Sequence, residues 1–233
     1  MQNSIPLTAG AIALGLVVPA IAGSNNFDFT DFDKVAVERG VEVNIVSGDD
    51  FHVAADASRQ SLLRRLEIRQ VGDTLKISRT GKSFFLFGLA DRYEVDVTLP
   101  TLAGVNASSG AEVEVRGAVT DRLEVRASSG SEVDLEGVSP SDLIVKVSSG
   151  AEVQASGSCA TLNVRGSSGG EVDAEDMVCD VAEIRTSSGA DVTAHVTDML
   201  AAQASSGSDI DIIGNPTVTR DDTSSGGKLA MVN

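Results

Sequence analysis

Residues 123–137 read LEVRASSGSEVDLEG, and residues 143–157 repeat the pattern as LIVKVSSGAEVQASG. The tripeptide Ser-Ser-Gly at the centre of both stretches recurs at steps of 18 to 20 residues through the second half of the chain. It begins at Ser108, Ser128, Ser148, Ser167, Ser187, Ser205 and Ser224. A fixed period of this length indicates one small unit stacked repeatedly, because each unit buries its apolar face only against its neighbours. The repeat therefore decides the fold.

Both flanks of the tripeptide alternate apolar and polar residues. Counting from its first Ser, the third residue before is Val125 and then Val145 in successive units, and the fifth residue after is Val133 and then Val153. Such alternation is typical of strands with one buried face, and the small residues between the flanks suit a tight bend. We predict an all-β, single-stranded parallel β-helix (solenoid) of about 20-residue coils, stacked at roughly 4.8 Å. We expect it to be right-handed.

Four segments follow one another along the chain. We expect a signal peptide over residues 1–22, N-terminal β-rich coils and a cap of the solenoid over 23–99, the Ser-Ser-Gly β-helix over 100–226, and a C-terminal tail over 227–233. The first segment is uncharged and apolar over residues 5–22 and ends Ala20-Ile21-Ala22, a small-x-small site that predicts cleavage after Ala22. A retained membrane anchor is the alternative, but the stretch is short and interrupted by proline.

Cleavage of this segment predicts an extracytoplasmic protein, located in the periplasm, secreted or at the cell surface, with no stable membrane span afterwards. The net charge of −16 agrees with export. Residues 100–233 carry 21 acidic against 8 basic residues, so the acidity belongs to the repeat. An acidic surface argues against nucleic acid or an anionic membrane as a partner, since both require a basic footprint.

The segment before the repeat contains further signals. Residues 71–75, Val-Gly-Asp-Thr-Leu, predict a hairpin turn, and a short helix is expected between Ser58 and Leu66. Phe84, Phe85 and Phe87 fit either a docking surface or a cap over the open end of the solenoid. A group of arginines around the expected helix fits either a basic patch for a partner or a solvated helix face. It comprises Arg59, Arg64, Arg65 and Arg69.

The outward-facing positions of the repeat hold most of its charged residues, which are the candidates for binding. The fourth residue after each reference serine is acidic in six units: Glu112, Glu132, Glu152, Glu171, Asp191 and Asp209. A second acidic position, two residues further on, holds Glu114, Asp134, Asp173 and Asp211. Stacked like charges repel unless they are solvated or neutralised by cations, so the ladder predicts either weak Ca²⁺ binding or a solvated face that resists aggregation. Two residues before the reference serine lies a basic series that compensates acids locally or binds an acidic polymer: Arg126, Lys146, Arg165 and Arg185.

The two cysteines occupy the same position in successive coils. Cys159 and Cys179 each precede the next Ser-Ser-Gly by eight residues. In-register coils place their Cα atoms about one strand spacing apart, within the range that a disulfide tolerates. Export favours a disulfide over a pair of buried thiols. A metal site with only these two ligands lacks partners.

The order of several segments resembles a known family. FDKVAVERGVEVNI over residues 32–45, DTLKI over 73–77, VDVTLP over 95–100 and the Ser-Ser-Gly coils are similar to the bacterial DUF2807 family, the putative auto-transporter adhesin, head GIN domain. The resemblance extends over nearly all of residues 27–225. It implies an exported β-helical protein with an adhesin-like role, and the family supplies no catalytic residues.

These features favour a non-catalytic protein that acts in adhesion or scaffolding, with a cell-surface or envelope protein or glycan as its partner. The alternative is a carbohydrate-binding or carbohydrate-active β-helix of the polysaccharide lyase type, which would use carboxylates and basic residues in a groove. The acids, however, recur at equivalent positions instead of forming one distinctive site, and His52 and His195 are expected at the surface or at strand ends. We expect no enzyme and no cofactor. Exposed end coils make a homodimer through the solenoid ends feasible.

Overall fold

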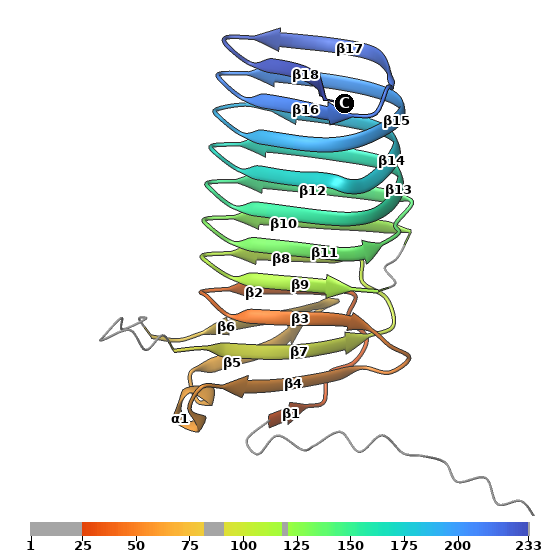
Figure 1. The fold of residues 1–233 in the computed structure, drawn as a ribbon. Coiled ribbons are helices and arrows are strands. Elements are labelled where there is room, and N and C mark those ends of the chain that lie inside the picture. Colours follow the sequence, from red (N-terminus) through yellow and green to blue (C-terminus); the bar gives the residue numbers. More distant parts are fainter. Residues whose placement is uncertain (1–24, 82–90, 118–120, 233) are drawn as a thin grey trace, which may run out of the picture.

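The protein forms a rod of stacked coils (Figure 1). The computed structural model describes residues 25–81, 91–117 and 121–232. Within them the chain builds a parallel β-solenoid of about six turns with coils of roughly 20 residues, which confirms the predicted fold. The predicted signal peptide with its cleavage site at Ala22, and the Phe84–Phe87 run, lie outside these residues.

Each coil has a strand before the bend and a strand after it. The pre-bend strands are β2 (Lys34–Glu38), β6 (Thr74–Arg79), β8 (Gly104–Ser108), β10 (Arg122–Ser128), β12 (Asp142–Ser148) and β17 (Thr217–Ser224). The post-bend strands are β3 (Glu42–Ser47), β7 (Tyr93–Leu99), β9 (Glu112–Arg116), β11 (Glu132–Val138), β16 (Asp209–Ile213) and β18 (Lys228–Val232). Three long strands run from one bend through the loose turn to the next bend: β13 (Glu152–Ser167), β14 (Glu171–Thr186) and β15 (Asp191–Ser205).

The core is a set of inward ladders that follow from the alternation in sequence. Val133 of β11 lies opposite Val113 of β9 and Val153 of β13, in parallel register. All three side chains are buried, as are Leu123 and Leu143 in the pre-bend ladder. Burial at about 25 cal/mol per Å² of apolar surface makes these ladders the main source of stability. Because register is fixed by the inward residues, the outward residues between them are also stacked in columns.

The Ser-Ser-Gly bend uses an uncommon backbone conformation. Its second serine and its glycine both have positive φ, as at Ser109 (58°) and Gly110 (71°). Glycine adopts this conformation without steric cost, whereas serine does so only with strain. Backbone hydrogen bonds between coils stabilise the bend, since Gly110 N–H donates to the Ser129 carbonyl at 3.1 Å and Gly130 N–H to the Ser149 carbonyl at 3.2 Å. The bend is therefore a structural part of the stack.

The first coils do not stack in sequence order. Strand β2 lies between β6 and β8, and β3 lies between β7 and β9, in parallel register on both sides. The coil of β2 and β3 is thus inserted between a later coil and the repeat proper (Figure 1). Its bend is formed by Arg39 and Gly40, whose φ angles of 66° and 64° match those of Ser-Gly in the other bends.

The N-terminal end of the rod is covered by further elements. Strand β4 (His52–Ala57) pairs antiparallel with β7, and β1 (Asn25–Phe27) pairs antiparallel with β4. On the other side, β5 (Leu66–Val71) pairs antiparallel with β6, which confirms the hairpin turn. Between β4 and β5 lies helix α1 (Gln60–Leu63), shorter than the segment expected to be helical. These additions satisfy strand edges that would otherwise be open to pairing with another chain.

At the C-terminal end one expectation is wrong. Most of residues 227–233 do not form a tail, because Lys228–Val232 is strand β18 and pairs in parallel with β16. The physical reason lies in the repeat. Leu229 stands five residues after Ser224 and opposite Ile210, so it continues the inward ladder and is partly buried. The final coil therefore has both a pre-bend strand and a post-bend strand.

Candidate functional site

The two outward faces of the rod carry stacked columns of charged residues. The post-bend strands present a column with eight consecutive acids, which we call the acidic column: Glu94, Glu42, Glu112, Glu132, Glu152, Glu171, Asp191 and Asp209. It contains all six residues predicted for this ladder. Glu94 and Glu42 extend it beyond the prediction, because their strands stack out of sequence order. Lys228 follows Asp209 at the last position.

Cations neutralise only the two ends of the acidic column. The Arg92 guanidinium donates to both carboxylate oxygens of Glu42, at 2.8 and 2.7 Å, and the Lys228 ammonium lies 3.7 Å from Asp209. Between these ends, Glu112, Glu132, Glu152, Glu171 and Asp191 form no salt bridge in the part of the chain that the structure describes. The middle of the column is therefore a continuous strip of uncompensated negative charge.

The electrostatic consequence is clearest at Glu132. Partial burial raises the pKa of this carboxyl above its ordinary value, and the neighbouring charges of Glu112, Glu152 and Asp134 raise it further. Like charges one strand spacing apart disfavour ionisation of one another. The position of Glu132 thus costs stability at neutral pH, which means that its place in the column is not explained by a contribution to the fold.

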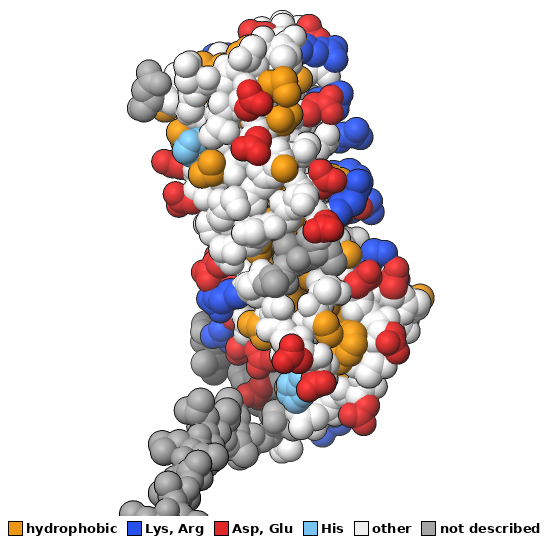
Figure 2. Space-filling model, turned by 90° about the vertical axis from the view of Figure 1, so that its right-hand side faces the viewer, with side chains coloured by type: hydrophobic (Ala, Val, Ile, Leu, Met, Phe, Trp, Pro, Cys, Tyr) orange, Lys and Arg blue, Asp and Glu red, His pale blue; other side chains and the backbone are white. Residues whose placement is uncertain are grey.

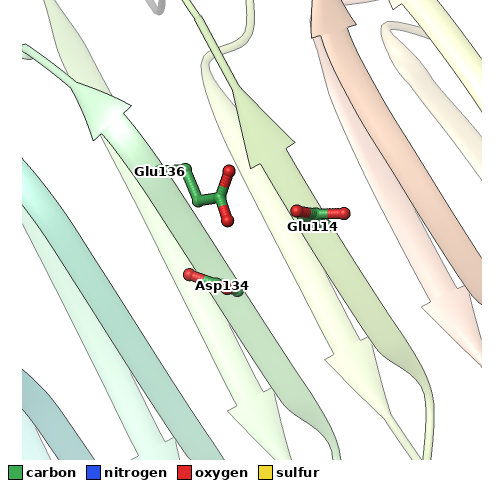
Figure 3. A group of neighbouring side chains, drawn as sticks. All are labelled: Glu114, Asp134 and Glu136. Carbon is green, nitrogen blue, oxygen red and sulfur yellow. The ribbon is translucent and has the colours of Figure 1, made fainter.

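The acids that gather most closely lie beside the acidic column. Single carboxylate oxygens of Glu114, Asp134 and Glu136 lie within 4.8 Å of one another on β9 and β11 (Figure 3). Glu136 did not figure in the prediction. The Arg116 guanidinium forms salt bridges with both Glu114 and Glu136, the latter at 2.5 Å, so this group already contains a cation. Calcium binding by the six residues of the predicted ladder remains a prediction.

The pre-bend face carries the opposite charge. Along it runs a column with six basic residues, which we call the basic column: Arg69, Lys76, Arg126, Lys146, Arg165 and Arg185. Ala36 and Asn106 occupy the two positions between Lys76 and Arg126. In Figure 2 basic side chains follow one another along one edge of the upper rod, with acidic side chains between them.

Ion pairs on the pre-bend face are local and incomplete. Glu124 accepts hydrogen bonds at 2.7 Å from Lys146 and from Arg126, and these contacts lower the pKa of the Glu124 carboxyl. Arg185 pairs with Glu183. In contrast, three members of the basic column form no salt bridge within the described residues: Arg69, Lys76 and Arg165. Positive charge without a salt bridge therefore remains at the lower end of the column, at Arg69 and Lys76, and at Arg165 next to its upper end.

The Ser-Ser-Gly repeat predicted the upper part of the basic column, from Arg126 to Arg185, but not its lower part. Arg69 was assigned to the arginine group around the short helix, but it lies on β5 opposite Lys76, away from Arg59 and Arg65, which pair with Asp91. The antiparallel hairpin and the inserted coil bring Arg69 and Lys76 into line with Arg126. The sequence marks the bend of the inserted coil, since Arg39-Gly40-Val41-Glu42-Val43 follows the pattern of Ser-Gly-Ala-Glu-Val, but it does not mark the place of this coil in the stack.

Three hollows follow one another along the pre-bend face. The first, of about 350 Å³, lies where Ala36, Gly104 and Asn106 leave space between Lys76 and Arg126. The second, of about 320 Å³, shares Glu124 with the first, and the third, of about 500 Å³, shares Arg165 with the second. The three hollows therefore adjoin one another along the basic column, and we call this row of hollows the groove.

The two cysteines meet inside the rod. Cys159 and Cys179 are paired in register, their Cα atoms lie 4.6 Å apart, and their sulfurs are joined in a disulfide. Both side chains are buried. The bond links the coils of β13 and β14, near the middle of the acidic column and at the upper end of the basic column. His52 and His195 lie far apart, on β4 and β15, and no pairing connects them.

A solenoid with charged columns on two outward faces belongs to the class of repeat proteins that offer extended binding surfaces. The chain is a member of the DUF2807 family, described as "Putative auto-transporter adhesin, head GIN domain", which matches residues 31–216. None of the curated proteins matches the chain.

Solved structures share the fold at low sequence identity. A putative adhesin from Bacteroides fragilis superimposes with a TM-score of 0.81 at 16% identity, covering 90% of this chain and 96% of the other. A putative adhesin from Parabacteroides distasonis gives 0.69 at 15% identity with the same coverage. A protein from the same species described as a putative lipid binding protein gives 0.64 at 16% identity, again over 90% and 96%. Similarity at this level shows the fold alone.

Over the described residues, no helix has the length and apolar character needed to cross a bilayer.

Proposed function

We propose that this protein is an exported, non-catalytic β-solenoid that binds a partner at the cell surface or in the envelope, in an adhesin-like role. The observation that carries the proposal is the repetition of charge on two outward faces. Glu112 to Asp209 and Arg126 to Arg185 recur at equivalent positions of successive coils. A catalytic site requires one distinctive arrangement of groups, whereas recognition of an extended surface benefits from repetition.

Family membership supports the same role. The family carries the description "Putative auto-transporter adhesin, head GIN domain", and the apolar segment over residues 5–22 predicts export. The cost of partly burying Glu132 among other acids supports a role in binding or solubility, since selection for stability alone would not retain it.

Protease accessibility on intact cells tests this proposal. The mature protein is expected to be cleaved when protease is added to intact cells, at the same rate as a known surface protein. Protection until the outer envelope is opened by osmotic shock would contradict an adhesin-like role. As a control, a periplasmic enzyme must remain intact before the envelope is opened.

The catalytic alternative has its own test. A lyase or hydrolase of acidic polysaccharides would shorten polygalacturonate, and the Glu132→Gln and Glu152→Gln variants would abolish the activity. We expect no turnover by the wild-type protein. Turnover that disappears in either variant would overturn the non-catalytic assignment.

A further inference from the structure

We propose that the groove on the pre-bend face binds a linear acidic polysaccharide, and that the hollow between Lys76 and Arg126 is its principal anion site. The proposal rests on the binding role inferred above and names the chemistry of the ligand. It is carried by the geometry of the hollow, by the free cations that line it, and by the continuity of the groove along the rod.

The hollow results from the choice of residues in the basic column. Four of its coils present long basic side chains, from Arg126 to Arg185, but the two positions below Arg126 are Asn106 and Ala36. Gly104 also lines the hollow and carries no side chain, and the Lys34 side chain lies close beside it, since a Cβ there would be only 3.3 Å from Lys34. The small residues thus form a floor, and the basic residues form walls on both sides.

The charge of the hollow is opposite to that of the protein. Four basic and two acidic residues line it, so its formal charge is about +2, taken as four minus two, on a chain of net charge −16. Glu124 is already neutralised by Lys146 and Arg126, and Lys34 is paired with Asp73 at 2.6 Å. Arg69 and Lys76 form no salt bridge to any described residue. Their donors are available to an anionic group of a ligand.

The remaining lining identifies the kind of anion. Thr74, Ser78 and Asn106 offer neutral hydrogen-bonding groups beside the cations, which suits a ligand that carries hydroxyl groups as well as carboxylates. No aromatic residue lines any of the three hollows in the described part of the chain. Single-stranded nucleic acids stack their bases on aromatic side chains, and protein partners anchor on aromatic and apolar residues. Uronate sugars fit the lining better than either.

The groove also fits a linear polymer. The three hollows share lining residues at Glu124 and Arg165, so a chain can pass from one to the next along the rod. From Arg126 to Arg185 a basic group recurs at each coil, at a spacing of about 4.8 Å, and below Arg126 the two positions of the hollow separate it from Lys76. A guanidinium binds a carboxylate through two parallel hydrogen bonds, and an ammonium binds it as a point charge. A polymer with regularly placed carboxylates therefore gains several contacts from one side.

Calorimetric titration with polygalacturonate oligomers tests the proposal on the full mature chain. The wild-type protein is expected to bind these oligomers and not a neutral dextran of equal length, with affinity that falls as salt increases. The Arg69→Ala/Lys76→Ala variant is expected to lose about tenfold in affinity for each lost charge-assisted contact. A variant with the same charge change outside the groove, Arg59→Ala/Arg64→Ala, serves as the matched control and is expected to bind like the wild type.

A second variant separates shape from charge. Ala36→Leu fills the floor of the hollow without altering any charge and is expected to weaken binding as strongly as the loss of one cation. Circular dichroism must show that all variants keep the wild-type fold. The proposal is overturned if the wild type does not bind, if both double variants weaken binding equally, or if a poly-glutamate peptide binds with the same dependence on Arg69 and Lys76, since the partner would then be an acidic protein.

These outcomes are distinguishable from failure of the adhesin-like role. If the protein is exposed at the surface and binds cells without requiring Arg69 and Lys76, the adhesin-like role stands and the proposed anion site is refuted. If the protein binds polygalacturonate through these residues but is protected inside the envelope, the anion site stands and the adhesin-like role is refuted.

Discussion

The pre-bend and post-bend faces belong to the same coils and meet at the same Ser-Ser-Gly bend. They differ in how far their charged side chains are paired in salt bridges. On the pre-bend face cations alternate with partners such as Glu124 and Glu183, and hollows separate them. On the post-bend face five acids stack without a salt bridge between two neutralised ends. The fold specifies only the inward ladders, so the difference between the faces reflects a requirement other than folding.

The largest expected effect comes from breaking the ladder that both faces share. Leu143→Ala removes a buried side chain from the middle of the rod and is expected to lower the free energy of unfolding by about 2–5 kcal/mol. Ile144→Ala, at the adjacent outward position, is expected to cost less than about 1 kcal/mol. Urea denaturation of both variants provides the measurement. Equal effects at the two positions would contradict the assignment of inward and outward residues.

The disulfide joins β13 to β14, in the middle of the acidic column and at the upper end of the basic column. It closes a loop with a sequence separation of 20 residues, so its removal is expected to cost about 3 kcal/mol. Thermal unfolding of the Cys159→Ala/Cys179→Ala variant, compared with wild-type protein in reducing agent, measures this contribution. Insensitivity of the wild type to the reducing agent would show that the thiols are not bonded in the isolated protein.

The opposite electrostatics of the faces predict opposite signs for two matched substitutions. Glu124→Gln removes an acid held between Lys146 and Arg126 and is expected to destabilise the protein at pH 7 by up to about 1 kcal/mol. Glu132→Gln removes an acid stacked between other acids and is expected to stabilise it by a few tenths of a kcal/mol, roughly the worth of a cross-strand pair. If both substitutions changed the free energy of unfolding in the same direction, the proposed electrostatic difference between the two faces would be wrong.

The pH dependence of these two variants sharpens the comparison. The pKa of Glu132 is raised in the folded protein. The stability gained in Glu132→Gln is therefore present above that raised pKa and disappears as the pH falls to 4.5, the ordinary pKa of a glutamate. The pKa of Glu124 is lowered, so the stability lost in Glu124→Gln persists down to pH 4.5 and disappears only below it. Unfolding curves measured between pH 7 and pH 3 would give the pH range over which each substitution changes stability. If the two ranges coincide, the opposite pKa shifts of Glu132 and Glu124 are wrong.

Calcium is expected to give the smallest effect. Arg116 already lies between Glu114 and Glu136, and the acidic column presents one carboxylate per coil. Calcium and magnesium are therefore expected to raise the melting temperature slightly and equally, by screening. A saturable, calcium-specific rise that is lost in Glu132→Gln would instead establish the ladder as a calcium site.

The repeat predicted most of the fold because register follows from residues that recur at a fixed period. The inward valines, the bends and the six acids from Glu112 to Asp209 all lie where the spacing placed them. The inserted coil of β2 and β3 was not predictable in this way, because stacking out of sequence order leaves no periodic signal. For the same reason the sequence separated Arg69 and Lys76 from Arg126, and the hollow between them became visible only in the structure.

Chemical acetylation of the lysines in the wild-type protein tests the central claim, which is that the partner binds the pre-bend face. Lys34, Lys76 and Lys146 lie on this face, whereas Lys228 lies on the post-bend face and provides an internal control. Mass spectrometry with and without polygalacturonate is expected to show reduced acetylation of the first three lysines and unchanged acetylation of Lys228. Equal protection of Lys228, or protection of none of them, would contradict the account.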